Sequence, residues 1–254
     1  MVSELFRLDG KVAVVTGSSR GLGQAAAVAL AEAGADLALV NRGSASDTAE
    51  QVKAAGRRVQ LIELDLGAAT PAELDSTIQS VVDTLGRVDV LVNNAGIIRR
   101  APLLEHSSTD WDDVLSTNLD AVFHLSQAVA KRYAAQGGGK IINIASMLSF
   151  QGGVFVPGYA ASKHAVAGLT KAFANELAVR GINVNAIAPG YMATDNTAAL
   201  RADDARQKAI LERIPAGRWG TPDDLKGALV FLASSASDYV NGAILPVDGG
   251  WLVR

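Results

Sequence analysis

Short apolar runs recur along the chain, and longer segments with helical composition separate them. The runs are rich in Val, Ile, Leu and Ala, which is typical of strands buried on both faces of a sheet. We predict strands over residues 11–15, 36–40, 58–64, 88–92, 140–144, 183–187 and 243–247. We predict helices over residues 24–33, 46–55, 70–85, 110–136, 158–179 and 221–233.

These elements alternate with short links and without a change in composition. The alternation predicts an α/β fold, a single Rossmann-type doubly wound parallel sheet with helices on both faces. We therefore expect residues 1–254 to form one domain, since α/β folds of about 250 residues often do.

Several predicted helices carry end signals. Thr70-Pro-Ala-Glu73 is a capping box with proline at the first helical position. Ser46 is expected to cap the second helix, and the run 107–109 (Ser-Ser-Thr) to cap the fourth. Gly34 and Gly56 follow predicted helices, at positions where glycine commonly ends a helix.

Residues 191–213 are the exception to the alternation, because a long segment separates a strand from the next helix. Part of it, residues 198–214, has a charged helical composition. An insertion beyond the carboxyl end of a parallel strand lies where α/β sheets bind ligands, so we expect a substrate lid here.

Composition narrows the class of protein. The chain has 254 residues, 49% of them hydrophobic and 19% charged, with a formal net charge of −3, which argues against a basic nucleic-acid surface. It has no cysteine, which is compatible with a cytoplasmic protein and excludes thiolate metal sites. Its histidines, His106, His124 and His164, are not spaced as metal ligands, so we expect no metal site.

Two stretches were tested as targeting or membrane segments. The N-terminal MVSELFRLDGK mixes acids with short apolar runs, so it is not expected to be a secretory signal. Residues 141–162 are uncharged but contain Asn, Gln, Ser, Gly and Pro, which is too polar for a membrane span.

Three glycines, Gly17, Gly21 and Gly23, directly follow the first strand and open a helix. Backbone approaches a pyrophosphate closely only where side chains are absent, and a helix N-terminus offers amide donors and a favourable dipole. The spacing is Gly-x-x-x-Gly-x-Gly rather than the commoner Gly-x-Gly-x-x-Gly. The context predicts a dinucleotide site; the alternative is a tight turn with close helix–strand packing.

The end of the second strand bears on which dinucleotide binds. An acid at this position would bond the adenosine ribose and repel a 2′-phosphate. The residues here are Asn41 and Arg42, and the glycine loop adds Arg20. Two guanidiniums without an acid favour NADP(H) over NAD(H), unless both arginines are ordinary surface residues.

The stretch from Ser146 to Lys163 places a hydroxyl, a phenol and an amine in one otherwise uncharged window. If Tyr159 lies at the start of a helix, Lys163 is one turn further on the same face. An ammonium beside a phenol favours the phenolate, so we expect Lys163 to lower the pKa of Tyr159. The alternative is an incidental Tyr-x-x-x-Lys pair on a solvated helix.

Two further features involve asparagine. Asn93-Asn94-Ala95-Gly96 ends the fourth strand, where side-chain amides can tie neighbouring strands together beside a cofactor. Asn118 falls inside the fourth predicted helix, where asparagine is disfavoured, which points to a specific role.

Together these motifs resemble the short-chain dehydrogenase/reductase family over nearly the whole chain. TGSSRGLG is similar to its cofactor loop, NNAG to its strand-end motif, and Asp65 in ELDL to its adenine-contacting acid. The segment 188–194 is similar to the one that closes over the nicotinamide. The expected cofactor-binding residues are Gly17, Ser19, Arg20, Gly21, Leu22, Gly23, Asn41, Arg42, Asp65, Leu66, Asn94, Ala95, Gly96, Tyr159, Lys163, Pro189, Gly190, Met192 and Thr194.

The resemblance also implies a catalytic tetrad, Asn118, Ser146, Tyr159 and Lys163. Tyr159 would exchange a proton with the substrate, Ser146 would bond the reacting oxygen, and Lys163 would hold the nicotinamide ribose. Asn118 would support a water relay from Lys163 to solvent. The family further implies a homotetramer, with the Tyr159 helix at one interface and the C-terminal strand region at another.

Within the family, NNAGIIRR, IINIASMLSFQGG and NAIAPGYMATDNT resemble members that act on sugar acids of the 2-deoxy-D-gluconate or 2-keto-3-deoxy-D-gluconate type. Those members generally prefer NAD(H), so NAD(H) stays open beside NADP(H). Arg99 and Arg100 are candidate partners of the substrate carboxylate. The remaining substrate candidates are Ser146, Met147, Gln151 and Tyr159.

Two other functions remain open. The cofactor loop also resembles that of NADPH-dependent 3-oxoacyl-(acyl-carrier-protein) reductases, so a carbonyl reductase is an alternative. A non-catalytic dinucleotide sensor is a second alternative, and it predicts an incomplete tetrad. All four tetrad residues are present.

Overall fold

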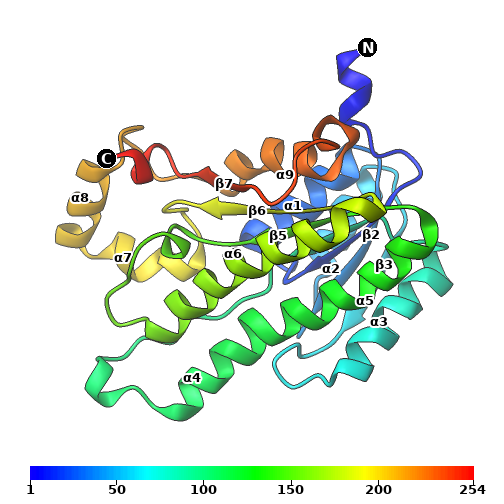
Figure 1. Ribbon diagram of the computed structural model, residues 1–254. Coiled ribbons are helices and arrows are strands. Elements are labelled where there is room, and N and C mark those ends of the chain that lie inside the picture. The colour runs from blue at the N-terminus through cyan, green and yellow to red at the C-terminus, as the bar shows by residue number, and fades with distance from the viewer.

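A seven-stranded parallel sheet runs through the molecule (Figure 1). The computed structural model describes residues 1–254, apart from the side chain of Asn196. The strand order is β3-β2-β1-β4-β5-β6-β7, and every neighbouring pair is parallel. The strands are β1 (Val12–Thr16), β2 (Asp36–Asn41), β3 (Val59–Glu63), β4 (Val90–Asn93), β5 (Gly139–Ile144), β6 (Ile182–Pro189) and β7 (Ile244–Val247).

Helices cover both faces of this sheet (Figure 1). They are α1 (Gly21–Glu32), α2 (Ser46–Ala54), α3 (Pro71–Leu85), α4 (Ser108–Leu115), α5 (Ala121–Gln136), α6 (Pro157–Leu177), α7 (Ala198–Ala202), α8 (Asp204–Arg213) and α9 (Lys226–Ala233). Apolar residues of α1, α2 and α9 form one core, and those of α3, α5 and α6 form another. The predicted doubly wound α/β sheet is confirmed.

β1 shows how the sequence builds both cores. Its five residues are all buried. Ala13 and Val15 pack in the core on the α1 side, whereas Val12 and Val14 pack in the core on the α3 side. Because successive strand residues point to opposite faces, a strand covered on both faces must be apolar throughout.

Helix ends follow the local signals with one correction. The Thr70 capping box is formed, since Thr70 Oγ1 accepts a bond from the Glu73 backbone N–H and the Glu73 carboxylate accepts one from the Thr70 N–H. The predicted Ser46 cap is wrong: Ser46 is the first residue of α2, and Ala45 precedes it without a side-chain cap bond. Ser46 instead bonds Ser44 and Asp47.

The predicted helix over 110–136 is interrupted. α4 and α5 are joined by a π-helical turn, Ser116–Asp120, so the helical path continues from Ser108 to Gln136 with one widened turn. π-helical turns inside α-helices are often found at functional sites, and this one contains Asn118.

The strand order reverses at β1, because the chain first adds β2 and β3 on one side and then returns to add β4 on the other. The loops after β1 and β4 therefore diverge and leave a crevice at the carboxyl edge of the sheet. The segment after β6 carries α7 and α8, which lie beside the C-terminal segment (Figure 1). Among the described residues, no helix combines the length and apolar character that a membrane crossing requires.

Candidate active site

The turn between β1 and α1 and the start of α1 contain three glycines, whose missing side chains allow a bound group to approach the backbone. Gly17 and Gly21 have positive φ angles of 64° and 57°. A Cβ atom on Gly23 would lie 2.1 Å from the Gly17 carbonyl oxygen. The N-cap of α1, Arg20, makes no side-chain cap bond, so its first amides are not capped by a side chain. An uncapped helix N-terminus behind a glycine turn suits a pyrophosphate.

The end of β2 meets this turn through a buried amide. Asn41 Nδ2 donates to Ser18 Oγ at 2.9 Å, and the Asn41 Oδ1 is buried without a partner among the described atoms. Arg42 is exposed. Arg20 pairs with Asp195 of the predicted lid at 3.2 Å, with both side chains largely exposed. Arg20 and Arg42 therefore lie at the expected edge, with Arg20 ion-paired to the lid.

The loop after β3 lies next to the end of β2, since the Leu64 backbone N–H donates to the Asn41 carbonyl at 2.8 Å. Asp65 is exposed, and its Oδ1 accepts from the Gly67 N–H at 3.1 Å. Leu66 is buried. This places Asp65 beside the predicted adenine side of the crevice.

The NNAG segment ties β4 to the glycine turn. Asn94 Nδ2 donates to the carbonyls of Thr16 and Gly17, both at 2.9 Å. Thr16 Oγ1 in turn accepts from the N–H groups of Asn94 and Ala95, both at 3.0 Å. Four bonds between two strand ends fix the width of the crevice. The predicted strand-tying role of the segment is confirmed for Asn94.

Beneath the crevice, a buried polar chain crosses the sheet. Asn93 Nδ2 donates to Asn143 Oδ1 at 2.9 Å and to Ser126 Oγ at 3.1 Å. Asn143 Nδ2 donates to Thr170 Oγ1 at 2.9 Å. The chain links β4, β5, α5 and α6, so the elements that carry the catalytic candidates are held together by buried hydrogen bonds.

Asn118 is fully buried in the π-helical turn. Its Oδ1 accepts from the Ile97 N–H at 2.8 Å, and its Nδ2 donates to the Ile97 carbonyl at 2.9 Å. Nδ2 also lies 3.2 Å from Ser162 Oγ, and that hydroxyl donates to the Tyr159 carbonyl. Ser162 was not predicted as a site residue; its sequence signal was only a serine three residues after Tyr159.

Ser146 and Tyr159 come together from β5 and α6. Ser146 follows β5 and is buried, and its Oγ accepts from the Leu148 N–H at 3.1 Å. Tyr159 is the third residue of α6, which begins at Pro157, and remains partly exposed. The Ser146 hydroxyl is close enough to the Tyr159 phenol to lower its pKa. The predicted meeting of hydroxyl and phenol is confirmed.

Lys163 lies one turn after Tyr159, as predicted, and is buried. Its Nζ donates to the Ile144 carbonyl at 2.6 Å and lies 5.6 Å from the centre of the Tyr159 ring. Ser149 Oγ donates to the Lys163 carbonyl at 2.7 Å, which fixes this turn of α6 to the end of β5.

The predicted electrostatic effect of Lys163 on Tyr159 is wrong in this structure. Burial raises the pKa of the Tyr159 phenol, while its hydrogen bond with Ser146 and the charge of Arg100 lower it. The net shift of the Tyr159 pKa is therefore upward, and burial reduces the pKa of Lys163 to about 8. A buried ammonium is disfavoured, so the lysine loses its proton near pH 8.

The two candidate substrate arginines differ. Arg99 pairs with Asp110 at 3.2 Å and with Asp113 at 3.1 Å, both on α4. Arg100 is exposed, and its charge acts on Tyr159. Arg99 is therefore held by two acids of α4, whereas the charge of Arg100 favours the phenolate of Tyr159.

The segment after Ser146 meets the lid. Met147 is buried in a small cluster with Ile210, Ile214 and Trp251. Gln151 accepts a bond from Arg213 Nη2 through its Oε1, at 3.3 Å. Arg213 and Trp251 were not predicted as site residues. Neither the lid helix nor the C-terminal segment has a sequence pattern that indicates its contact with the segment after Ser146.

The base of the lid lies beside the glycine turn. Thr194 Cγ2 would lie 3.7 Å from a Cβ on Gly21. Pro189 ends β6, and a Cβ on Gly190 would lie 2.5 Å from the Asp248 Cα, so the chain passes closely there. Met192 is buried and packs in the core on the α1 side. Met192 thus has a packing role, while Thr194 faces the predicted cofactor loop.

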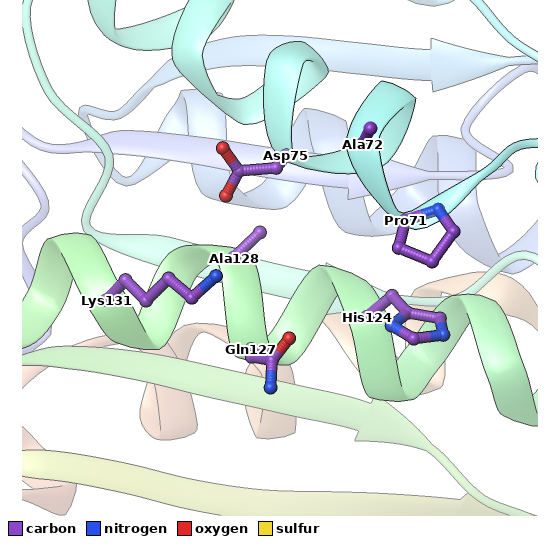
Figure 2. A pocket seen from close by; sticks show the side chains of 7 residues that line it. All are labelled: Pro71, Ala72, Asp75, His124, Gln127, Ala128 and Lys131. Carbon is purple, nitrogen blue, oxygen red and sulfur yellow. The ribbon is translucent and has the colours of Figure 1, made fainter.

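Two small cavities lie beside α3 and α5, and the second is also lined by Ser116 and Asp120 of the π-helical turn that contains Asn118. One of about 250 Å³ is lined by Pro71, Ala72, Asp75, His124, Gln127, Ala128 and Lys131 (Figure 2). The other, of about 220 Å³, extends from His124 to Leu66. Asp75 is paired with Arg132 at 2.7 Å. Over the described part of the chain, no cluster of acids and histidines could hold a metal.

The chain is similar to known proteins along nearly its whole length. The family described as "Enoyl-(Acyl carrier protein) reductase" matches residues 17–252. The chain is 58% identical over 257 residues to a 2-dehydro-3-deoxy-D-gluconate 5-dehydrogenase of Escherichia coli (strain K12), covering 100% of both chains.

Solved structures agree with this match. A putative 2-deoxy-D-gluconate 3-dehydrogenase from Agrobacterium tumefaciens with bound NADP is 55% identical, with a TM-score of 0.92 over 98% of this chain and 99% of that one. A gluconate 5-dehydrogenase from Burkholderia cenocepacia in complex with NADP and tartrate is 42% identical, with a TM-score of 0.95 over 100% of both chains.

Proposed function

Because the chain belongs to the short-chain dehydrogenase/reductase family, we propose that it is an NAD(P)-dependent oxidoreductase acting on sugar acids. It transfers a hydride between a nicotinamide cofactor and a secondary alcohol or ketone of a 2-deoxy-D-gluconate or 2-keto-3-deoxy-D-gluconate type substrate. The observation that carries this proposal is the Ser146–Tyr159 pair, in which the hydroxyl lowers the pKa of the phenol, with Lys163 one turn away, at the edge of the sheet that also carries the glycine turn.

The residues of the crevice suit a nicotinamide dinucleotide. The glycine turn and the α1 N-terminus would hold the pyrophosphate. Asp65 and Leu66 would contact the adenine, and Arg20 and Arg42 a 2′-phosphate. Lys163 would hold the nicotinamide ribose. When bound, the cofactor supplies or accepts the hydride. Both NAD(H) and NADP(H) are used in the family; the missing acid after β2 and the NADP of two similar structures favour NADP(H).

The protein's own part is to move one proton and to fix the reacting oxygen. Tyr159 gives its hydroxyl proton to the carbonyl oxygen in reduction and takes it back in oxidation. Ser146 donates a hydrogen bond to the same oxygen. Lys163, with its pKa near 8, returns a proton to Tyr159 after the phenol has given its own to the substrate. Asn118 holds the Ile97 backbone in the loop after β4.

Substrate recognition includes Arg100, since its charge acts on the phenol that meets the reacting oxygen. Arg99 is not part of this proposal, because two acids of α4 already hold its guanidinium. The relatives' names differ in the carbon that is oxidised, which is C5 in one name and C3 in the other. A test of the substrate therefore needs sugar acids oxidised at each of these two carbons.

The description of the matching family supports a second candidate, reduction of an acyl thioester. The relative that is 58% identical is named for a sugar acid, which favours the first candidate. Activity with an acetoacetyl thioester that exceeds activity with every sugar acid would reverse this order.

The proposal extends to assembly and location. Residues 1–254 form one dinucleotide-binding domain with a substrate lid at 191–213, and the protein is a cytoplasmic homotetramer. Family resemblance supports the tetramer, together with exposed apolar residues on α5 and at the C-terminus such as Phe123 and Val253. Sedimentation equilibrium would show a tetramer, and a monomer at micromolar concentration would refute this part.

The experiment that tests the proposed function is a set of initial rates with NAD(H) and NADP(H) across a panel of sugar acids and their keto forms. We expect turnover of a keto-deoxy-gluconate with at least one cofactor. Tyr159→Phe should abolish turnover while NADP⁺ still quenches tryptophan fluorescence. Retained turnover in this variant would overturn the assignment of Tyr159.

A further inference from the structure

Arg213 is the last residue of lid helix α8, and its side chain reaches the wall of the active site. Its guanidinium carbon lies 4.0 Å from the centre of the Trp251 ring. Its Nη2 donates to Gln151 Oε1 at 3.3 Å. The side chain thus bridges three parts of the chain that are distant in sequence: the lid, the C-terminal segment and the loop after Ser146.

The Trp251 ring fixes where this guanidinium lies. Trp251 is 5% exposed and packs with Met147, Ile210 and Ile214. Met147 directly follows Ser146, so the ring under Arg213 is part of the same wall as the catalytic hydroxyl. A planar guanidinium stacked on an indole keeps its N–H groups in a fixed fork, which favours two-point contact with a carboxylate.

The charge of Arg213 is available to a ligand. Within the part of the chain that the structure describes, no carboxylate lies within ion-pairing distance of it. Other arginines near the site are ion-paired, Arg20 with Asp195 and Arg99 with two acids of α4. On α8 itself, Glu212 faces Lys208 at 3.9 Å. The Arg213 guanidinium therefore lies beside the substrate wall without an ion-pair partner among the described residues.

The two cationic side chains at the site act on different places. Arg100 is a charge that acts on the Tyr159 phenol, so it belongs to the reacting end of the substrate. Arg213 instead contacts Gln151 and Trp251, on the lid side of the wall. A sugar acid likewise has a reacting carbon and a carboxylate several bonds away.

We propose that Arg213, with Gln151, binds the carboxylate of the substrate. This inference rests on the proposed sugar-acid function and adds the residues that recognise the acid. Gln151 holds Arg213 through its oxygen, which leaves its amide N–H groups to donate to the same carboxylate. Because Arg213 belongs to the lid and Gln151 to the wall, a bound carboxylate joins the two and favours the lid position seen here.

The test compares an acid with its uncharged analogue. Steady-state rates are measured with 2-keto-3-deoxy-D-gluconate and with its carboxamide, for the wild type, Arg213→Gln and Arg213→Lys. We expect Arg213→Gln to lower kcat/KM for the acid by about 10- to 100-fold, mainly through KM, since bonds to charged groups contribute about 1.5–3 kcal/mol. The rate with the carboxamide should change less than about threefold. Arg213→Lys should lie between, because it keeps the charge but not the fork.

Lys208→Gln is the matched control, because it removes a cation from the exposed face of the same helix. It should leave kcat/KM for both substrates unchanged. Gln151→Glu is a second variant that does not remove Arg213; it should raise KM for the acid and not for the carboxamide. NADP⁺ affinity and the melting temperature of each variant report whether the fold is intact.

The outcomes separate this inference from the proposed function. A wild type without activity on every sugar acid refutes the function, and the inference falls with it. A wild type active on the acid, with Arg213→Gln lowering acid and carboxamide equally, makes Arg213 a lid latch only and overturns the inference. An unchanged Arg213→Gln overturns it as well.

Discussion

Asn118 hydrogen-bonds both backbone polar groups of Ile97, accepting from its N–H and donating to its carbonyl. One amide side chain thereby holds the loop after β4 against the π-helical turn between α4 and α5. The same side chain contacts Ser162, which bonds the carbonyl of Tyr159. The position of the catalytic phenol is therefore coupled to the position of the loop after β4 through Asn118.

Replacing Asn118 by Ala should weaken both stability and turnover. The substitution leaves the partly buried N–H and carbonyl of Ile97 without their partner. We expect a cost of about 1 kcal/mol, at the low end of the range for an unsatisfied buried group. Urea unfolding would measure the loss, and kcat should fall because the Ile97 loop and α6 lose their connection. Gln127→Ala, at an exposed position of α5, should change neither quantity. A variant with wild-type kcat would contradict the coupling.

Gly23→Ala should weaken cofactor binding. The new Cβ would lie 2.1 Å from the Gly17 carbonyl and 2.4 Å from Asn94 Nδ2, so the glycine turn must move. We expect NADP⁺ affinity to fall at least about tenfold, which corresponds to about 1.4 kcal/mol. Gly43→Ala is the control, because a Cβ there meets nothing within 4 Å. Equal affinities of the two variants in a fluorescence titration would refute the pyrophosphate assignment.

Arg100→Met should shift the pH profile of the reaction upward. The positive charge of Arg100 lowers the pKa of Tyr159, so removing it lets that pKa rise. Alcohol oxidation requires the phenolate, and its acid limb should therefore move to higher pH, with several-fold slower oxidation near neutral pH. Carbonyl reduction requires the neutral phenol, and its alkaline limb should move the same way.

The matched comparison is Arg99→Met, which removes a cation one residue away. Arg99 pairs with Asp110 and Asp113, and neither pair is buried. Exposed pairs contribute little, so stability should change by less than about 1 kcal/mol and the limbs should stay in place. Identical shifts in both variants would contradict a specific effect of Arg100.

Lys163 should make stability depend on pH. Its pKa is about 8 in the folded protein and near 10.5 when unfolded, so the unfolded state binds more protons between these values. Stability should then rise with pH from about 8 to 10.5, and the penalty for burying the charge is present in full below about pH 8. Urea unfolding of wild type and Lys163→Met at several pH values would measure the difference.

With a difference of about 2.5 pKa units, the wild type should gain about 3 kcal/mol relative to Lys163→Met over that interval. The comparison with the methionine variant removes the contributions of other titrating groups. A constant difference from pH 7 to 10 would show that the lysine is not desolvated in the folded protein.

The sequence alone determined the sheet and the places where chemistry is concentrated. Buried strands covered on both faces must be apolar throughout, so runs such as 11–15 and 36–40 predicted β1 and β2 closely. Glycine spacing, the NNAG segment and the Tyr159–Lys163 spacing are local features, because each acts within one turn or one strand end. These features can be interpreted without knowing which distant segments meet.

Tertiary structure decided the electrostatics and the partners. Lys163 was expected to lower the pKa of Tyr159, yet desolvation raises the pKa of Tyr159 and lowers that of Lys163 itself. The widened turn that buries Asn118 depends on Ile97, which lies 21 residues away. Arg99 and Arg100 are adjacent in sequence, and only the folded position of α4 shows that Arg99 is the one that pairs with its acids. Arg213 and Trp251 meet Gln151 through packing between distant segments, and no local sequence pattern encodes such contacts.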